Sequence, residues 1–327
     1  MSKNALIVMS VLEQKKSVTA VALEFGVTRQ WVHELIRRYR ILGADSFQPS
    51  SKRPQSNSKA LTEQMHAEIF QLRQELLAKG LDAGAQSIQF YLIAKHTRAP
   101  ALSTIWRSLR DQGLVQHQPK KRPIAYRQRF EADQPNETWQ SDFTHVKLAN
   151  GQDIEVLNFL DDHSRLLLGC QAHYRVTARI VVADFMKLVT EFGAPYSTLT
   201  DNGLVFTARF RNGKNAFEYL LESLGIEQKN SRPNHPQTQG KIERFHQTLK
   251  RWLAAQAKPR SIQELQVLLD QFQYLYNTER PHRAVNGQTP RQAYDARPKA
   301  KPNKDPIFGA ARTRTDRVDS AGKVSLL

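Results

Sequence analysis

The sequence predicts an α/β protein with a mixed five-stranded sheet flanked by helices, preceded by all-α modules. Two observations favour this fold class. Residues 1–116 have apolar residues at helical spacing, whereas after Glu137 the sequence changes to alternating apolar and polar residues. From that point, three strand-like segments are followed by helices and strands in alternation, which is typical of a mixed sheet with helices on its faces.

The core of this fold is expected at residues 136–295. Asn150 and Gly151 give a strong hairpin signal between the first two strands, and 177–192 has the spacing of an amphipathic helix. The strands are expected at 139–148, 154–160, 165–174, 196–200 and 226–230. The helices are expected at 177–192, 215–224, 238–256 and 261–277.

Residues 1–45 predict a helix-turn-helix DNA-binding domain. Thr28 is placed to cap a second helix, and Gly26 permits a tight turn before it. The second helix would carry polar and basic residues beside its apolar stripe, as a helix that enters a major groove does. The alternative is an ordinary helical hairpin. The candidate DNA contacts are Arg29, Gln30, His33 and Arg37.

Residues 46–60 are rich in Ser, Pro and Lys and predict a linker. The helical block at 61–116 ends in a segment where Ser103 can cap a helix that carries Arg107. We interpret this block as a second, winged or helix-turn-helix-like DNA-binding module with Arg107 as a DNA contact. A plain helical spacer explains it equally well. Residues 117–135 predict a basic linker.

The charge distribution points to a polyanionic partner. The formal net charge is +17, and residues 131–295 contribute nothing to it, with 19 Lys and Arg against 19 Asp and Glu. Residues 1–130 carry 21 basic and 9 acidic residues, and the basic tail at 296–327 carries 8 and 3. Basic ends around a neutral middle suit DNA held by the flanks. The alternative is that the tails only aid solubility.

Several function classes are excluded. The single cysteine, Cys170, excludes an intrachain disulfide framework and a multi-cysteine zinc site. No apolar run approaches the length of a membrane span, and we expect no membrane partner. A phosphate-binding loop of nucleotide-driven enzymes is absent from the sequence. We expect a protein of the reducing cytoplasm.

Three acidic residues lie where a sheet could bring them together. Asp142 lies inside the first strand, where Asp is unfavourable, and Asp201 follows the fourth strand. Glu243 lies on the helix after the fifth strand. Two carboxylates ~4 Å apart repel by ~4 kcal/mol at an effective dielectric constant of ~20, unless one is protonated or a cation lies between them. Hard divalent ions prefer such oxygens. Asp162 is interpreted as a turn or salt-bridge residue.

The helix of Glu243 adds candidate phosphate contacts. Lys250 lies two turns beyond Glu243 on nearly the same face, and His246 lies one turn beyond it. Lys241 ends a loop rich in hydrogen-bond donors. These residues could hold a DNA backbone beside the acids. The alternative is a solvated helix face.

At these residues the sequence resembles the integrase-core insertion-sequence transposases, which are relatives of retroviral integrase in the DDE superfamily. The motifs that carry the resemblance lie at 139–144, 159–165, 200–203, 234–245 and 276–283, followed by Thr289 and Pro290. The resemblance implies a ribonuclease H-like core at 136–295. It also implies that Asp142, Asp201 and Glu243 are the catalytic, metal-binding triad and that Lys250 contacts DNA near it.

Three departures from the family pattern stand out. The interval between Asp201 and Glu243 is longer than in many relatives, and we place the extra residues in a loop near 209–215. Residues 1–130 contain no cysteine, so helix-turn-helix modules take the place of the zinc domain of retroviral relatives. The end, 317–327, has the pattern of an opening hairpin, which we interpret as a truncated β module.

The resulting expectation is a DNA transposase that binds the ends of a mobile element. It would use two Mg²⁺ or Mn²⁺ ions to cut DNA strands and join them to target DNA. Its partners would be double-stranded DNA, as terminal repeats and as target, and further copies of itself, and bound protein would be associated with the bacterial nucleoid. A catalytically inactive, transposase-derived DNA-binding protein and a nuclease that cuts without joining are the alternatives. Arg283 and His282 either contact DNA or pack the last helix.

Overall fold

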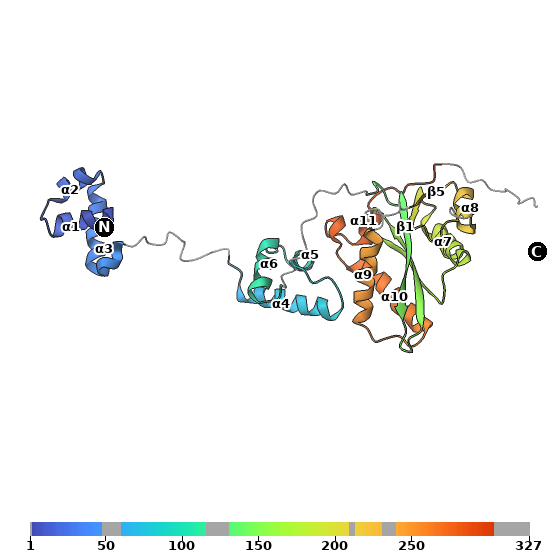
Figure 1. Ribbon diagram of the computed structural model, residues 1–327. Coiled ribbons are helices and arrows are strands. Elements are labelled where there is room, and N and C mark those ends of the chain that lie inside the picture. The colour runs from blue at the N-terminus through green and yellow to red at the C-terminus, as the bar shows by residue number, and fades with distance from the viewer. Residues whose placement is uncertain (1, 48–59, 116–130, 209–212, 231–239, 304–327) are drawn as a thin grey trace, which may run out of the picture. The chain divides into compact units, whose positions relative to one another are not determined.

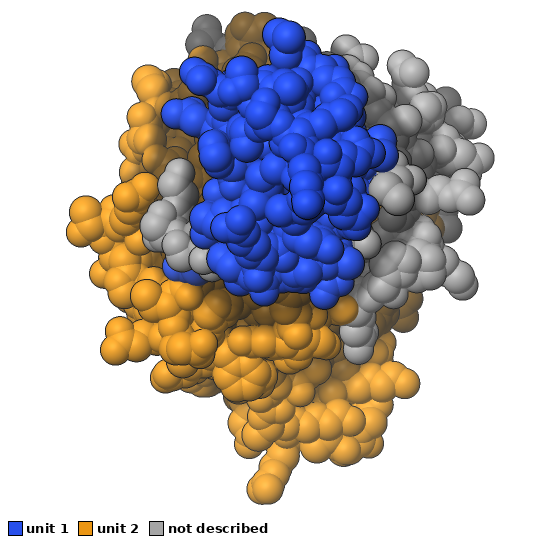
Figure 2. Space-filling model, turned by 90° about the vertical axis from the view of Figure 1, so that its left-hand side faces the viewer, with its two compact units in different colours: residues 1–60 blue, residues 61–327 orange. Residues whose placement is uncertain are grey.

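A computed structural model describes residues 2–47, 60–115, 131–208, 213–230 and 240–303 (Figure 1). Most of the two expected linkers, part of the expected insertion, the loop at 231–239 and the tail from 304 lie outside these residues. The chain divides into two compact units, residues 1–60 and 61–327, which Figure 2 colours separately. In the described part of the chain, no helix has the length and apolar character of a membrane span.

The first unit contains three helices, and their ends follow from capping residues. They are α1 (Lys3–Leu12), α2 (Val18–Phe25) and α3 (Arg29–Leu42), followed by a short 3-10 helix, η1 (Gly43–Phe47). The Thr28 hydroxyl accepts a hydrogen bond from the Trp31 amide at the start of α3. Gly26 ends α2 at a φ of 61°, a left-handed conformation that glycine adopts at low cost. α2 and α3 thus occupy the segment in which the sequence predicts a helix-turn-helix.

The second unit begins with a helical module of α4 (Glu63–Ala78), α5 (Ala85–Lys95) and α6 (Leu102–Asp111). Arg73 of α4 ties the module together, because its guanidinium donates to the carbonyls of Ala83 and Leu114 at 2.7 Å each. The apolar residues of α4, α5 and α6 belong to the same buried cluster as those of the last helices of the chain. The module is therefore part of the unit that holds the sheet.

The sheet has five strands in the order β3-β2-β1-β4-β5. β1 pairs antiparallel with β2, and β2 with β3, whereas β4 and β5 run parallel to β1. This mixed sheet with flanking helices is a ribonuclease H-like arrangement, and it confirms the fold class that the sequence predicts. The strands are β1 (Thr138–Lys147), β2 (Asp153–Asp161), β3 (Leu167–His173), β4 (Ser197–Thr200) and β5 (Glu227–Asn230).

Helices cover both faces of the sheet (Figure 1). α7 (Ala178–Phe192) and α8 (Ala216–Ser223) lie on one face, where they pack on apolar residues of β1 and β2 such as Trp139 and Phe159. α9 (Gly240–Ala254) and α10 (Ile262–Tyr274) lie on the other, where they pack on Val156 and Leu160. Successive residues of β2 point to opposite faces, so both helical layers draw on the same strand.

Edge strand β3 is covered by amide side chains. Gln266 of α10 accepts from the Ala172 amide and donates to the Cys170 carbonyl. Gln273 of α10 donates to Leu167 and Leu168, and Asn277 of the next segment, η3 (Leu275–Glu279), bonds both backbone groups of Leu167. These bonds occupy backbone groups that would otherwise be free to pair with another strand.

The chain ends, in its described part, with η4 (Arg283–Val285) and α11 (Pro290–Asp295). Asp82, in the loop after α4, forms ion pairs with Arg251 of α9 and with Arg280, which follows η3. At Gly80, a Cβ atom would lie 2.7 Å from the Arg251 carbonyl oxygen, so only glycine permits this approach. The loop 80–82 therefore packs directly on the helix that carries Glu243.

Candidate active site

Strand register places Asp142 and Asp201 next to each other. Ser141 of β1 pairs with Thr200, the last residue of β4, in the parallel ladder. Asp142 and Asp201 directly follow this pair of residues, and neighbouring strands lie about 4.8 Å apart. The Asp142 carboxylate accepts the Phe143 amide at 2.8 Å, and the Asp201 carboxylate accepts the Gly203 amide at 2.9 Å.

Glu243 brings a third carboxylate to the same region. It lies in the first turn of α9, which packs over the face of β1. Burial, together with the negative charges of Asp201 and Glu243, raises the pKa of Asp142 to about 6. Asp201 and Glu243 are therefore both close enough to Asp142 for their charges to act on it.

His246 and Asn158 form a buried pair beside Asp142. Asn158 lies opposite Asp142 in the antiparallel ladder, and its amide nitrogen lies 3.1 Å from Nε2 of His246. Nδ1 of His246 lies 3.8 Å from an Asp142 carboxylate oxygen. Burial lowers the pKa of His246 to about 4, so the ring is neutral near pH 7. With Nε2 accepting from Asn158, Nδ1 carries the proton toward Asp142.

Asn158 is a site residue that the sequence reasoning missed. The signal in the sequence is a polar residue between the apolar residues of β2, and the structure shows that this residue is fully buried. A polar side chain at such a position is unfavourable unless a partner satisfies it, so it indicated a specific contact. The partner of Asn158 is His246, which the sequence predicted as a DNA contact and which is only 8% exposed.

The donor set suits a hard divalent cation. All three acids offer carboxylate oxygens, which Mg²⁺ and Mn²⁺ prefer, and a cation among them would relieve the repulsion that raises the pKa of Asp142. Among the described residues, no three His, Cys, Asp or Glu side chains already lie close enough together to hold one ion.

Lys241 forms a buried ion pair at the start of α9. Its ammonium group lies 2.6 Å from both carboxylate oxygens of Asp162, which is fully buried. Asp162 also accepts from the side chain of Gln140 at 2.6 Å and from the amide of Ala132 at 2.8 Å. The prediction that Asp162 is a salt-bridge residue is confirmed. Burial lowers the pKa of Lys241.

The remaining predicted DNA contacts lie on exposed helix faces. Lys250 is exposed on α9, and its charge also contributes to the lowered pKa of His246. On α3, the Glu34 carboxylate accepts from two basic residues, Arg37 at 2.9 Å and Arg38 at 2.8 Å. The exposed candidates are Arg29, Gln30, His33 and Arg37 on α3 and Arg107 on α6.

His282 and Arg283 differ in their surroundings. The His282 ring packs edge-on against Tyr276, with 6.2 Å between ring centroids, and its Nδ1 accepts from the Ala284 amide. Burial lowers the pKa of His282 to about 3. Arg283 is exposed. The packing interpretation therefore fits His282, and Arg283 is the more exposed of the two.

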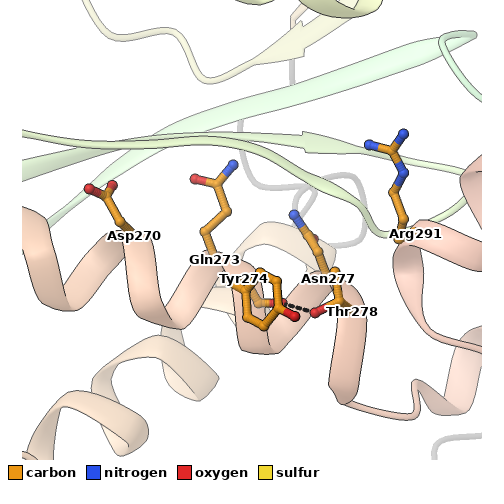
Figure 3. Close-up of a pocket in the computed structure, with 6 residues that line it drawn as sticks. All are labelled: Asp270, Gln273, Tyr274, Asn277, Thr278 and Arg291. Atoms are coloured by element: carbon orange, nitrogen blue, oxygen red, sulfur yellow. Dashed lines mark hydrogen bonds between the residues drawn. The ribbon is translucent and has the colours of Figure 1, made fainter.

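An open cavity of about 370 Å³ lies apart from these acids, along α10, η3 and α11 (Figure 3). Its polar groups already serve the fold. Gln273 and Asn277 donate to β3, Arg291 pairs with Asp295, and the Thr278 hydroxyl donates to the Tyr274 carbonyl, as the dashed line in Figure 3 shows. This cavity is not a candidate catalytic site.

Comparison with known proteins agrees with the geometry. Residues 132–236 match a family model described as Integrase core domain, and residues 224–290 match a second model of the same description. The chain carries an integrase core domain. Its curated relatives include proteins of insertion elements.

Two such relatives show the extent of the similarity. Transposase InsD for insertion element IS2D of Escherichia coli K12 is 29% identical over 212 residues, which cover 59% of this chain and 66% of that protein. The 39.2 kDa protein of insertion element IS476 of Xanthomonas euvesicatoria is 28% identical over 179 residues, which cover 53% of this chain. The chain spans 48% of the IS476 protein, or about half its length.

The solved structures that resemble the chain include the catalytic core domains of two viral integrases. The catalytic core domain of BIV integrase is 27% identical, covers 49% of this chain and 95% of its own, and gives a TM-score of 0.38. The HTLV-2 integrase catalytic core domain in complex with magnesium is 20% identical, covers 50% of this chain and 98% of its own, and gives a TM-score of 0.38.

Proposed function

We propose that this protein is a DNA transposase that cuts DNA at the ends of a mobile element and joins those ends to target DNA. The proposal rests on the placement of three acids: Asp142 on β1, Asp201 directly after β4 and Glu243 in the first turn of α9. Strand register makes Asp142 and Asp201 neighbours, and the charge of Glu243 acts on Asp142. Such a carboxylate group suits metal-dependent substitution at a phosphodiester.

Asp142, Asp201 and Glu243 would hold two divalent ions, Mg²⁺ or Mn²⁺. The ions, when bound, supply activation of the attacking oxygen and neutralisation of charge on the leaving oxygen. The chain's own contribution is to aim the carboxylates. Neutral His246, held by Asn158, fixes the space beside Asp142 without adding a positive charge that would compete with a cation.

Double-stranded DNA would be held by basic helix faces of both units. Lys250 on α9 would contact the backbone near the scissile phosphate, because it is exposed on the helix that also bears Glu243. Arg29, Gln30, His33 and Arg37 on α3 would read the terminal repeat, and Arg107 on α6 would contact flanking DNA. The joining of two ends requires more than one copy of the chain, so we also propose a homo-oligomer in the active complex.

The main rival is a catalytically inactive, transposase-derived DNA-binding protein. The proposed function is favoured over it because all three acids are present and the charges of Asp201 and Glu243 act on Asp142. A nuclease that cuts without joining uses the same group of acids, so only an assay that scores both products distinguishes it.

A strand-transfer assay with the element's own terminal repeat tests the proposal. We expect Mg²⁺-dependent cutting and joining by the wild-type protein, and a loss of about a thousandfold or more in Asp142→Asn, Asp201→Asn and Glu243→Gln, with end binding nearly unchanged. Full activity in any of the three variants, or in the presence of excess chelator, would contradict the proposal. Cutting without joining would support the nuclease.

A further inference from the structure

One buried carboxylate connects the two segments that carry Asp142 and Glu243. Asp162, the residue directly after β2, has no exposed surface. It binds the Gln140 side chain, which lies two residues before Asp142 on β1, and the Lys241 ammonium group, which lies two residues before Glu243 on α9. Both bonds are 2.6 Å long. The relative position of the two acids is thus coupled to a single side chain.

No other charged side chain described in the structure pairs as closely with the Asp162 carboxylate as Lys241 does. Arg165 approaches Asp162 at 3.9 Å, but its nearer partner is Glu131 at 2.7 Å. Among the residues that the structure describes, Lys241 is therefore the closest cation to the Asp162 carboxylate, which is fully buried. A buried ion loses its hydration and requires a close partner of opposite charge, so the Asp162–Lys241 pair constrains the first turn of α9.

We infer that Lys241 and Asp162 form a clamp that positions Glu243 toward Asp142 and thereby sets the affinity of the proposed cation site. The inference rests on the proposed function and assigns Lys241 a positioning role in place of a DNA contact. The side chain of Lys241 is 22% exposed, and its ammonium group points to Asp162. Groups that orient metal ligands typically change metal affinity 10- to 100-fold when they are removed.

Mn²⁺ titration of the full chain, followed by the electron paramagnetic resonance signal of free Mn²⁺, tests the clamp. We expect Lys241→Met to weaken Mn²⁺ binding about tenfold and Lys241→Arg to restore it to within about threefold, because Arg keeps the ion pair. Lys258→Met is the matched control, since Lys258 is exposed beyond the end of α9, and it should bind Mn²⁺ like the wild type. If Lys241→Met does not fold, Lys241→Gln takes its place.

DNA binding at several salt concentrations separates the clamp from a DNA contact. The clamp predicts that Lys241→Met binds terminal-repeat DNA with wild-type affinity and salt dependence. Unchanged Mn²⁺ binding together with a salt slope reduced by about one would overturn the clamp and make Lys241 a phosphate contact.

The same titration distinguishes failure of the clamp from failure of the proposed function. Equal Mn²⁺ binding by wild type and Asp142→Asn would overturn the proposed cation site itself. Reduced binding by Asp142→Asn with unchanged binding by Lys241→Met would overturn the clamp alone. Faster amide hydrogen exchange at residues 242–245 in Lys241→Met would support the clamp independently of any metal, and unchanged exchange would contradict it.

Discussion

The two faces of the sheet use the same strands for different purposes. Under α7 and α8, β1 and β2 present apolar residues, and aromatic rings pack edge to face around Phe185. Under α9, the alternate residues of the same strands include Gln140, Asp142 and Asn158, each with a polar partner on or near α9. One face therefore supplies stability, and the other gives up part of its apolar contact to hold a charged site.

The largest stability effect should come from the apolar face. Phe185 is fully buried and lies 5.2–5.9 Å, between ring centroids, from Trp139, Phe159 and Phe217. We expect Phe185→Ala to lower the free energy of unfolding by about 3–5 kcal/mol, measured by urea denaturation, because it leaves a cavity. The neighbouring Met186→Ala, at a 37% exposed position, should cost less than about 1 kcal/mol. Equal losses of stability in Phe185→Ala and Met186→Ala would show that the buried aromatic cluster is not a main source of stability.

On the polar face, removal of a charge should stabilise the fold. Burial and the neighbouring acids raise the pKa of Asp142 from 3.8 to about 6. Near pH 7 the carboxylate is therefore less favourable in the native state than in the unfolded chain. Asp142→Asn should therefore raise the free energy of unfolding by about 1–2 kcal/mol, a value reduced to allow for its 21% exposed side chain. Asp111→Asn, at an exposed position on α6, is the control and should change little. A destabilised Asp142→Asn protein would argue against crowding of the acids.

The pH dependence of stability sharpens the same contrast. The pKa of His246 falls from 6.5 to about 4 on burial, so below pH 6.5 the unfolded chain binds a proton that the native state does not. This group therefore makes stability rise with pH from about 4 to 6.5, by at most roughly 2 kcal/mol between pH 5 and 6.5. Asp142 acts in the opposite direction between about pH 4 and 6, because its native pKa is raised.

Denaturation of single variants at pH 5 and pH 7 checks this opposition. Asp142→Asn should show a steeper rise of stability with pH than the wild type, and His246→Asn a shallower one. Identical pH profiles for the three proteins would show that neither group is perturbed by burial.

The smallest effect is expected on the exposed face of α3. Arg37 is exposed and bonded to Glu34, so Arg37→Ala should leave the fold intact. We expect it to weaken terminal-repeat binding about tenfold and to reduce the salt slope by about one if it contacts a phosphate. Arg40→Ala, one turn further along the same helix, is a comparison for a general loss of charge. An identical loss in both variants would show that charge alone, without a specific contact, accounts for the effect.

Local pattern was sufficient to predict most elements of the core. The alternation and the Asn150-Gly151 turn predicted strands at 139–148 and 154–160, and the structure has β1 at Thr138–Lys147 and β2 at Asp153–Asp161. Helical spacing predicted a helix at 177–192, where α7 occupies Ala178–Phe192. These elements depend on neighbouring residues along the chain, which is the information that a sequence pattern contains.

The contacts that define the site could not be predicted in this way. The Asp162–Lys241 pair joins residues 79 positions apart, and the Asn158–His246 contact joins residues 88 apart. Both depend on the order of the strands and on the placement of α9 over β1, which no local pattern specifies. Asp142, Asp201 and Glu243 were identified only because their residue types were unusual in their places and because the motifs around them resemble a known family.

Crystals of the protein soaked in Mn²⁺ would test the central claim most directly, through the anomalous signal of manganese. The account predicts peaks bridged by the carboxylates of Asp142, Asp201 and Glu243, and no peaks there in Asp142→Asn. Manganese bound only at other surface acids, with the three carboxylates left apart, would contradict the assignment of this group as the catalytic centre.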